Sequence, residues 1–284
     1  IGLNEILNAI ENAKTDTRIT GISIKSLELN AGISQIKAIR DKIEEFKETG
    51  KFVMAYADLY SQQSYYLASV ADSIYINPIG SVDFKGLSSE VLFYKNLQEK
   101  TGVTMEVIRH GKYKSAVEPF LNNEMSAANK EQMSTFIQSI WNELTKGIAV
   151  SRNVSEKKLN NIADNLLGRN AKLAIENKLI DEAIYLDEYV TKLKLASQNT
   201  IQKKLQKVKI NDYILSGKGK LKQTSSNRIA VIYAQGEIIY GKGNENFIGQ
   251  DLYQSGRVAA KLMDMLLKKA KSSSEQQSSN VVAF

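Results

Sequence analysis

The sequence has 284 residues, of which 43% are hydrophobic and 24% charged, as in a soluble globular protein. It contains no cysteine and one histidine, His110, which excludes disulfides, cysteine metal sites and histidine-rich metal sites. The net charge of +7 is uneven, because residues 191–228 hold ten Lys and Arg and one Asp, which leaves −2 elsewhere. Tyr213 is the only aromatic residue among these charges, whereas nucleic-acid-binding segments commonly combine basic and aromatic residues. The pattern therefore favours a solvated basic helix and linker, and we expect no nucleic-acid partner. No stretch reaches the roughly 18 apolar residues of a membrane span.

The first 110 residues alternate between helix and strand patterns. Helical spacing of apolar residues runs over 3–16 and 32–50, and helices are also expected over 62–71 and 88–102. Short apolar runs predict strands near 19–25, 51–57, 72–77 and 103–109. This alternation predicts an α/β domain with a largely parallel sheet.

After Pro119 the pattern becomes helical. One apolar stripe runs through 125–153, and further helices are expected near 155–166, 171–178 and 186–207. Residues 217–227 read as a polar Gly/Lys/Ser linker, and "NRIAVIYAQGEIIYGKG" then starts again as a strand and turn.

Two short segments point to an internal repeat. "IGLNEIL" at 1–7 is similar to "IGQDLYQ" at 248–254, and a new strand pattern precedes the second copy. We expect two tandem α/β repeats, the first without its opening strand and the second with little beyond its opening. The expected division is a first repeat over 1–120, a helical extension over 121–216, a linker over 217–228, the start of the second repeat over 229–252, and a divergent, disordered tail over 253–284. The chain begins at Ile1, inside a helical pattern, so we expect it to be a piece of a longer protein.

The segment "GKYKSAVEPF", residues 111–120, holds two lysines, a serine, a glutamate and one of the two prolines of the chain. Among 38 Lys and Arg, composition alone makes a given lysine a solvated surface charge. A lysine can activate a serine only when it is neutral, and its reference pKa of about 10.4 must then be lowered by burial and nearby dipoles.

This segment resembles the lysine motif of the signal peptide peptidase A (protease IV) family, which are serine–lysine peptidases of the Clp protease/crotonase superfamily. The likeness continues through 67–87, "NNEMSAANKEQ", "GRNAKLAIENKLID" and "IAVIYAQGEIIYGKGNENFIGQD", and covers about residues 1–252. The resemblance implies an α/β fold, a Clp protease/crotonase-like repeat with a largely parallel sheet, followed by a helical segment and a truncated second repeat.

The resemblance also assigns residue roles. It makes Lys114 the general base, which serves a serine from the second repeat, whereas Lys112 stands at a variable position of the motif. The serine belongs to a stretch resembling "ASGGYYIA", which this chain does not reach. The counterpart in the first repeat is "SQQSYYLA", residues 61–68, where Gln62 takes the serine position and Gln63 and Ser64 replace glycines. We therefore expect no nucleophile in this chain.

Other candidates are weaker on chemical grounds. His110 could be paired with Ser115, but no carboxylate is obviously aimed at its ring, and a structural or surface histidine is favoured. Ser61 and Ser64 could stand in as nucleophiles, but packing or helix capping is the favoured interpretation of Ser64. We assign Glu118 no catalytic role.

By resemblance, the complete enzyme would be an endopeptidase that degrades cleaved signal peptides in or at the bacterial cell membrane, with its active part on the extracytoplasmic side. Peptide substrates, a homo-oligomer, membrane association through a segment preceding Ile1, and neither metal nor cofactor are expected, and this chain alone is expected to be inactive. The alternative is a catalytically inactive assembly or peptide-binding module, which Gln62 favours. Crotonase chemistry on acyl-CoA thioesters shares the fold, but the lysine motif argues against it.

Overall fold

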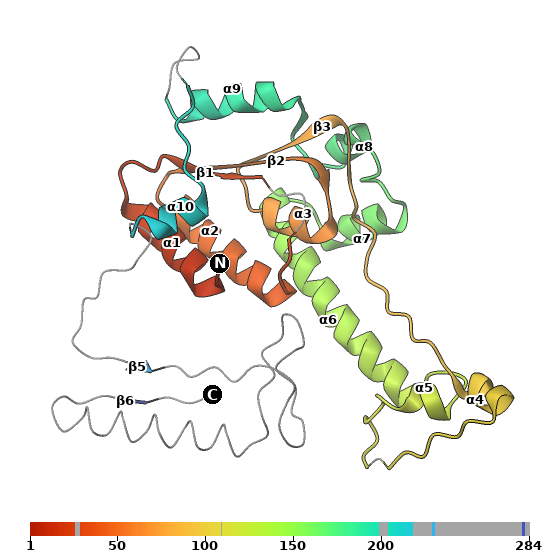
Figure 1. Cartoon of the computed structure of the whole chain (residues 1–284). Coiled ribbons are helices and arrows are strands. Elements are labelled where there is room, and N and C mark those ends of the chain that lie inside the picture. Colours follow the sequence, from red (N-terminus) through yellow and green to blue (C-terminus); the bar gives the residue numbers. More distant parts are fainter. Residues whose placement is uncertain (26–28, 109, 199–203, 218–228, 231–279, 282–284) are drawn as a thin grey trace. The chain divides into compact units, whose positions relative to one another are not determined.

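The computed structural model describes residues 1–25, 29–108, 110–198, 204–217, 229–230 and 280–281 (Figure 1). The chain divides into two compact units, 1–221 and 222–284. In the second unit the described residues are two short strands, β5 (Ile229–Ala230) and β6 (Asn280–Val281), which pair in parallel. Most of the expected linker, second-repeat opening and tail lies outside the described residues, so the division at 217–228 and at 253 stays a prediction.

The first unit is built on a four-stranded parallel sheet. Its order is β1 (Gly21–Ile24), β2 (Phe52–Tyr60), β3 (Ser73–Val82) and β4 (Glu182–Ala183). Gly21 pairs with Phe52, Met54 with Ser73 and Tyr75 with Glu182. The expected strands near 19–25, 51–57 and 72–77 are therefore confirmed, as is the α/β class with a parallel sheet.

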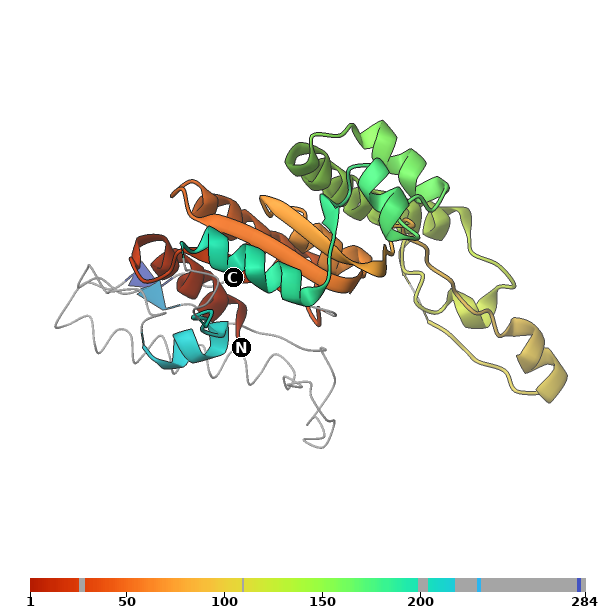
Figure 2. The same cartoon turned by 90° about the horizontal axis from the view of Figure 1, so that it is seen from above.

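Both faces of β2 are buried, as parallel sheets require. Val53, Ala55 and Ala57 face a large apolar core shared with α1 (Leu3–Thr15), α2 (Ile33–Lys47), α3 (Gln62–Ala68) and α6 (Ala127–Arg152). Met54 and Tyr56 point the other way, against Tyr189 of α9 (Leu186–Ala196), whose ring stacks on that of Tyr56 at 5.0 Å. Figure 2 shows α9 lying along this second face of the sheet.

The remaining helices of the core are short. They are α7 (Glu156–Asp164), α8 (Ala171–Glu176) and α10 (Ile210–Leu215). Helices near 155–166 and 171–178 are thus confirmed, whereas the one expected over 186–207 ends at Ala196, and residues 204–208 are not helical. Ser126, Ser155 and Asn170 begin α6, α7 and α8 by accepting a backbone N–H, which is the usual chemistry of a helix start.

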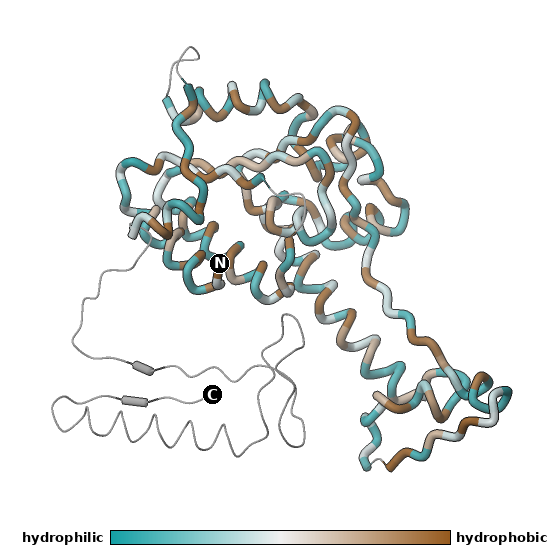
Figure 3. The backbone as a smooth tube through the Cα atoms, viewed as in Figure 1, coloured by the Kyte–Doolittle hydropathy of each residue, from teal (hydrophilic) through white to brown (hydrophobic). Residues whose placement is uncertain are grey.

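Residues 83–126, called the arm below, leave the sheet after β3 and end at the start of α6, which carries the chain back to the core (Figure 1). The arm contains α4 (Lys95–Thr101) and α5 (Glu118–Leu121). Figure 3 shows apolar residues at intervals along it as well as in the core. Val103, Met105 and Ile108 of the arm are exposed.

Two sequence expectations for the arm are wrong. Residues 103–108 form no strand, because no neighbouring strand pairs with their backbone and a strand is stable only with a partner. The helix expected over 88–102 begins only at Lys95. Val91, Phe93 and Tyr94 before it are weaker helix formers than the Lys, Leu, Gln and Glu residues of α4, and burial does not compensate for this.

Candidate active site

The lysine motif lies at the end of the arm that is far from the sheet (Figure 1). Gly111 has φ +105°, a backbone conformation that favours glycine, and its carbonyl accepts the Lys114 N–H at 3.3 Å. Lys114 follows this turn and is exposed, as is Lys112, whose ammonium lies 5.0 Å from the centre of the Tyr113 ring. The turn therefore presents Lys114 on the surface of the arm.

Glu118 fixes the motif to the start of α6. Its side chain is 1% exposed, and its carboxylate accepts hydrogen bonds from Ser126 Oγ at 2.6 Å, Ser126 N at 3.2 Å and Asn129 Nδ2 at 2.9 Å. A carboxylate at a helix N-terminus also interacts favourably with the helix dipole. The sequence analysis gave Glu118 no catalytic role, and these contacts are structural. The sequence signal for them was the serine of "NNEMSAANKEQ", Ser126, which lies eight residues after Glu118.

Contacts between α4 and α5 hold the rest of this end of the arm. The Tyr94 and Phe120 rings stack at 5.7 Å. Tyr94 N donates to the Pro119 carbonyl at 2.6 Å, and Gln98 Nε2 donates to the Phe120 carbonyl at 2.8 Å. The loop with Lys114 is thus supported by packed neighbours on both sides.

Ser61 and Ser64 both serve the start of α3. Ser61 Oγ accepts the Ser64 N–H at 3.2 Å, and Ser64 Oγ donates to the Ser61 carbonyl at 3.0 Å. Ser64 is 3% exposed. These contacts are those of a capped helix start, which supports capping for both residues.

Gln62 is bound to the loop that follows β3. Its Oε1 accepts the N–H groups of Lys85 at 3.2 Å and of Gly86 at 3.1 Å, and its Nε2 donates to the Gly86 carbonyl at 3.1 Å. The side chain at the position that the resemblance gives to the nucleophile therefore makes three hydrogen bonds to backbone.

The structure does not bring Lys114 together with Ser61 or Ser64. Arg40 ties α3 to the C-terminal part of α6, since it donates to the Tyr66 carbonyl at 3.2 Å and to the Gly147 carbonyl at 2.8 Å. Gly147 and Ser126 are about 30 Å apart along α6 at 1.5 Å per residue. Figure 1 shows α3 and α5 at opposite ends of this helix.

His110 is exposed, and no contact among the described residues joins it to a carboxylate. Ser115 is half-buried and its carbonyl accepts the Glu118 N–H at 2.9 Å. Within the described part of the chain, no group of three His, Cys, Asp or Glu side chains could hold a metal ion.

A model of peptidase family S49 matches residues 45–200, more than half of the chain. The chain belongs to peptidase family S49. The match includes the lysine motif, α3 with Gln62, and β2, β3 and β4 of the sheet, so the four-stranded parallel sheet is consistent with the Clp protease/crotonase-like domain of S49 peptidases.

Relatives agree with this membership. Over 259 residues the chain is 35% identical to Protease 4 of Haemophilus influenzae and 35% identical to Protease 4 of Salmonella typhi, and these matches cover 87% and 88% of the chain. It is 28% identical to the chloroplastic serine protease SPPA of Arabidopsis thaliana over 86% of the chain. The chain spans 42%, 41% and 36% of these three proteins, respectively.

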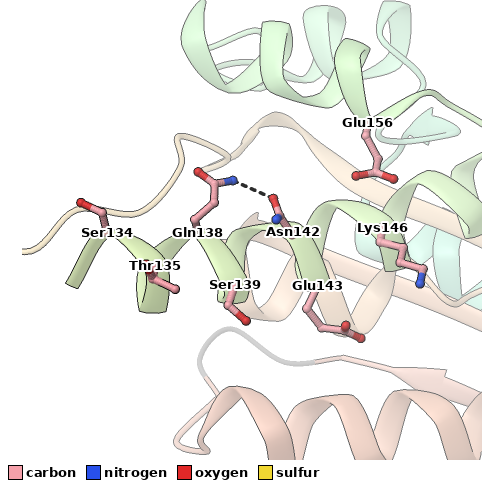
Figure 4. A pocket seen from close by; sticks show the side chains of 8 residues that line it. All are labelled: Ser134, Thr135, Gln138, Ser139, Asn142, Glu143, Lys146 and Glu156. Carbon is pink, nitrogen blue, oxygen red and sulfur yellow. Dashed lines mark hydrogen bonds between the residues drawn. The ribbon is translucent and has the colours of Figure 1, made fainter. Parts of the chain in front are cut away.

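The described grooves of this S49 chain lie away from Lys114. One, of about 870 Å³, runs along the polar side of α6 and reaches Glu156 of α7, with Gln138 bonded to Asn142 in its wall (Figure 4). Another, of about 780 Å³, lies between the sheet and α9 beside Tyr56, Asp58 and Asp187. Neither groove is lined by a residue of the lysine motif, 111–120. No helix in the described ranges is long and apolar enough to cross a membrane.

Proposed function

We propose that this chain is the half of a serine–lysine endopeptidase that supplies the general base, Lys114, to a serine on a second repeat. The observation that carries this proposal is the placement of Lys114. It is exposed on the surface of the arm and remote from Ser61 and Ser64 of its own α/β core, and Glu118 of the same motif is hydrogen-bonded to the start of α6. An exposed base at this end of the arm is accessible to a nucleophile that another folded unit brings to it.

The chemistry follows from this arrangement. Docking of the second repeat over Lys114 removes its ammonium group from water, which favours the neutral amine. Lys114 Nζ then accepts the proton of the serine hydroxyl while the serine oxygen bonds to the peptide carbonyl carbon, and it returns this proton to the leaving amine. Water subsequently hydrolyses the acyl-enzyme by the same route.

We further propose cleaved signal peptides as the substrates, at the extracytoplasmic side of a bacterial membrane and in a homo-oligomer, with no cofactor. This proposal rests on family membership and on the names of the relatives, Protease 4 and serine protease SPPA. The proposed first repeat, 1–120, holds β1, β2, β3 and the arm as far as Phe120, and β4 adds an edge strand from the proposed helical extension, 121–216.

A second candidate function is a non-catalytic assembly or peptide-binding module. Gln62 at the nucleophile position favours it, since an amide cannot attack a carbonyl carbon, and so do the exposed apolar residues of the arm.

Complementation separates the two functions. The chain alone should hydrolyse no fluorogenic peptide, because Ser61 and Ser64 cap α3, remote from the arm that carries Lys114. In a second protein, the chain is fused to the part of the H. influenzae relative that it does not match. This fusion should cleave the peptide, and a serine-directed inhibitor should stop the cleavage. Serine-reagent-sensitive activity of the chain alone would contradict the proposal and would require a nucleophile among Ser61, Ser64 and Ser115. A well-folded fusion without activity would favour the non-catalytic module.

A further inference from the structure

The first leg of the arm is tied to the core up to Gly86. Asp83 N donates to the Tyr60 carbonyl at 2.8 Å, and Phe84 is 1% exposed, with its ring 5.1 Å from that of Trp141. The three hydrogen bonds of Gln62 to Lys85 and Gly86 follow directly. No hydrogen bond joins the described residues 87–93 to the core, and the next backbone contact is Tyr94 to Pro119. Gln62 is thus the last attachment before the arm departs.

The geometry at Gly86 makes this attachment directional. Gly86 has φ +88°, a conformation that turns the chain and that other residues rarely adopt. The amide of Gln62 contacts both the N–H and the C=O of this one residue, so it fixes the orientation of the peptide as well as its position. A single hydrogen bond would fix one atom of Gly86 and would restrict the orientation of its peptide less than these two contacts do.

We propose that Gln62 is a positioning residue for Lys114: from the nucleophile position of this repeat, it fixes the direction in which the arm leaves the core. The chain returns from the arm to the core through α6, whose C-terminal part is fixed by Arg40. With residues 83–86 and α6 both attached to the core, the end of the arm that carries Lys114 keeps one placement for the second repeat to meet. This inference rests on the proposed function.

The absence of cysteine makes the placement measurable in the full chain. Ala116→Cys places a spin label two residues from Lys114, and Lys172→Cys on α8, with an 86% exposed side chain, places one on the core. Distances between the labels are then measured by electron paramagnetic resonance. Gln62→Ala should broaden the distance distribution, and Gln62→Glu, which keeps an acceptor for Lys85 and Gly86, should restore part of its sharpness. Gln63→Ala is the matched control, because Gln63 is the exposed neighbour on the same helix. An unchanged distribution in Gln62→Ala would overturn the proposal.

Activity of the fusion described above gives the second readout. Gln62→Ala should lower kcat by about 10- to 100-fold with KM unchanged, since misplacement of a catalytic group costs rate and not substrate binding. Gln62→Glu should recover part of the loss. Full kcat in Gln62→Ala, while Lys114→Ala is inactive, would overturn the positioning role and leave the proposed function standing. Full activity in Lys114→Ala would instead refute the proposed function, and the label distances would still decide whether Gln62 fixes the arm.

Discussion

At the scale of single residues, the lysine motif owes its shape to Glu118. A buried carboxylate is costly unless hydrogen bonds satisfy it, and Ser126 and Asn129 provide three. These bonds couple the motif to the first turn of α6. The Glu in "VEPF" is therefore explained by local structure and not by catalysis.

Removal of this carboxylate should loosen the start of α6. We expect Glu118→Ala to cost about 1–3 kcal/mol, the range for leaving buried donors without an acceptor, and Glu118→Gln to cost less. Hydrogen exchange of the Ser126 and Asn129 amides should accelerate in Glu118→Ala. Glu124→Ala, an exposed glutamate of the same loop, should leave both rates unchanged. Equal exchange rates in Glu118→Ala and wild type would refute this role.

At the scale of elements, α10 is attached to α1 through Asp16. The Asp16 carboxylate accepts hydrogen bonds from Arg18 Nε at 2.8 Å and from Tyr213 Oη at 3.0 Å. Hydrogen bonds from the Arg18 side chain are the main cause that holds the pKa of Asp16 well below its ordinary value of 3.8. Burial raises the pKa of Tyr213 to about 12.

The stabilisation that Asp16 provides should be lost at low pH. A carboxyl whose folded pKa is depressed stabilises the fold above its unfolded pKa of about 4, and this contribution is lost as the pH falls towards the folded pKa. We expect wild type to have a higher melting temperature than Asp16→Asn at about pH 5, with the difference shrinking towards pH 2. Calorimetric scans across this range measure it, and a difference that is constant with pH would refute the role of the charge.

The contact of α3 with α6 gives a prediction whose sign is informative. A Cβ added at Gly147 would lie 2.9 Å from the Tyr66 ring, which itself contacts the Arg40 guanidinium at 5.2 Å. Helix propensity alone predicts that Gly147→Ala stabilises by about 1 kcal/mol. Overpacking of about 1–3 kcal/mol should exceed this gain and lower the denaturation midpoint. A raised midpoint would show that the two helices separate without cost.

The strands and the contacts of the lysine motif differ in how far the sequence predicts them. β1, β2 and β3 were predictable because each packs an apolar run against the core, that of β1 being partly buried, whereas 103–108 has the same kind of run without a neighbouring strand. Lys114 is proposed as the base through its motif alone, because nothing in its spacing to other residues shows where it lies. The contacts of Glu118 and Gln62 depend on segments that only folding brings together.

At the scale of the whole molecule, the S49 chain separates a packed α/β core from an arm that carries the lysine motif. Tertiary contacts in the core account for its strands, and the arm owes its order to Glu118, to the α4–α5 contacts and to α6. This separation is what a base that is shared between two folded units requires.

The most direct test of this account is the effect of Lys114 on cleavage by the fusion with the remainder of the H. influenzae relative. Lys114→Ala should abolish peptide hydrolysis while circular dichroism and melting temperature stay those of the unsubstituted fusion. Lys112→Ala, two residues away in the same exposed turn, is the matched control and should keep kcat/KM within about threefold, as expected of a surface substitution. A folded Lys114→Ala fusion that cleaves peptide at the unsubstituted rate would contradict the account and make the motif an ordinary loop.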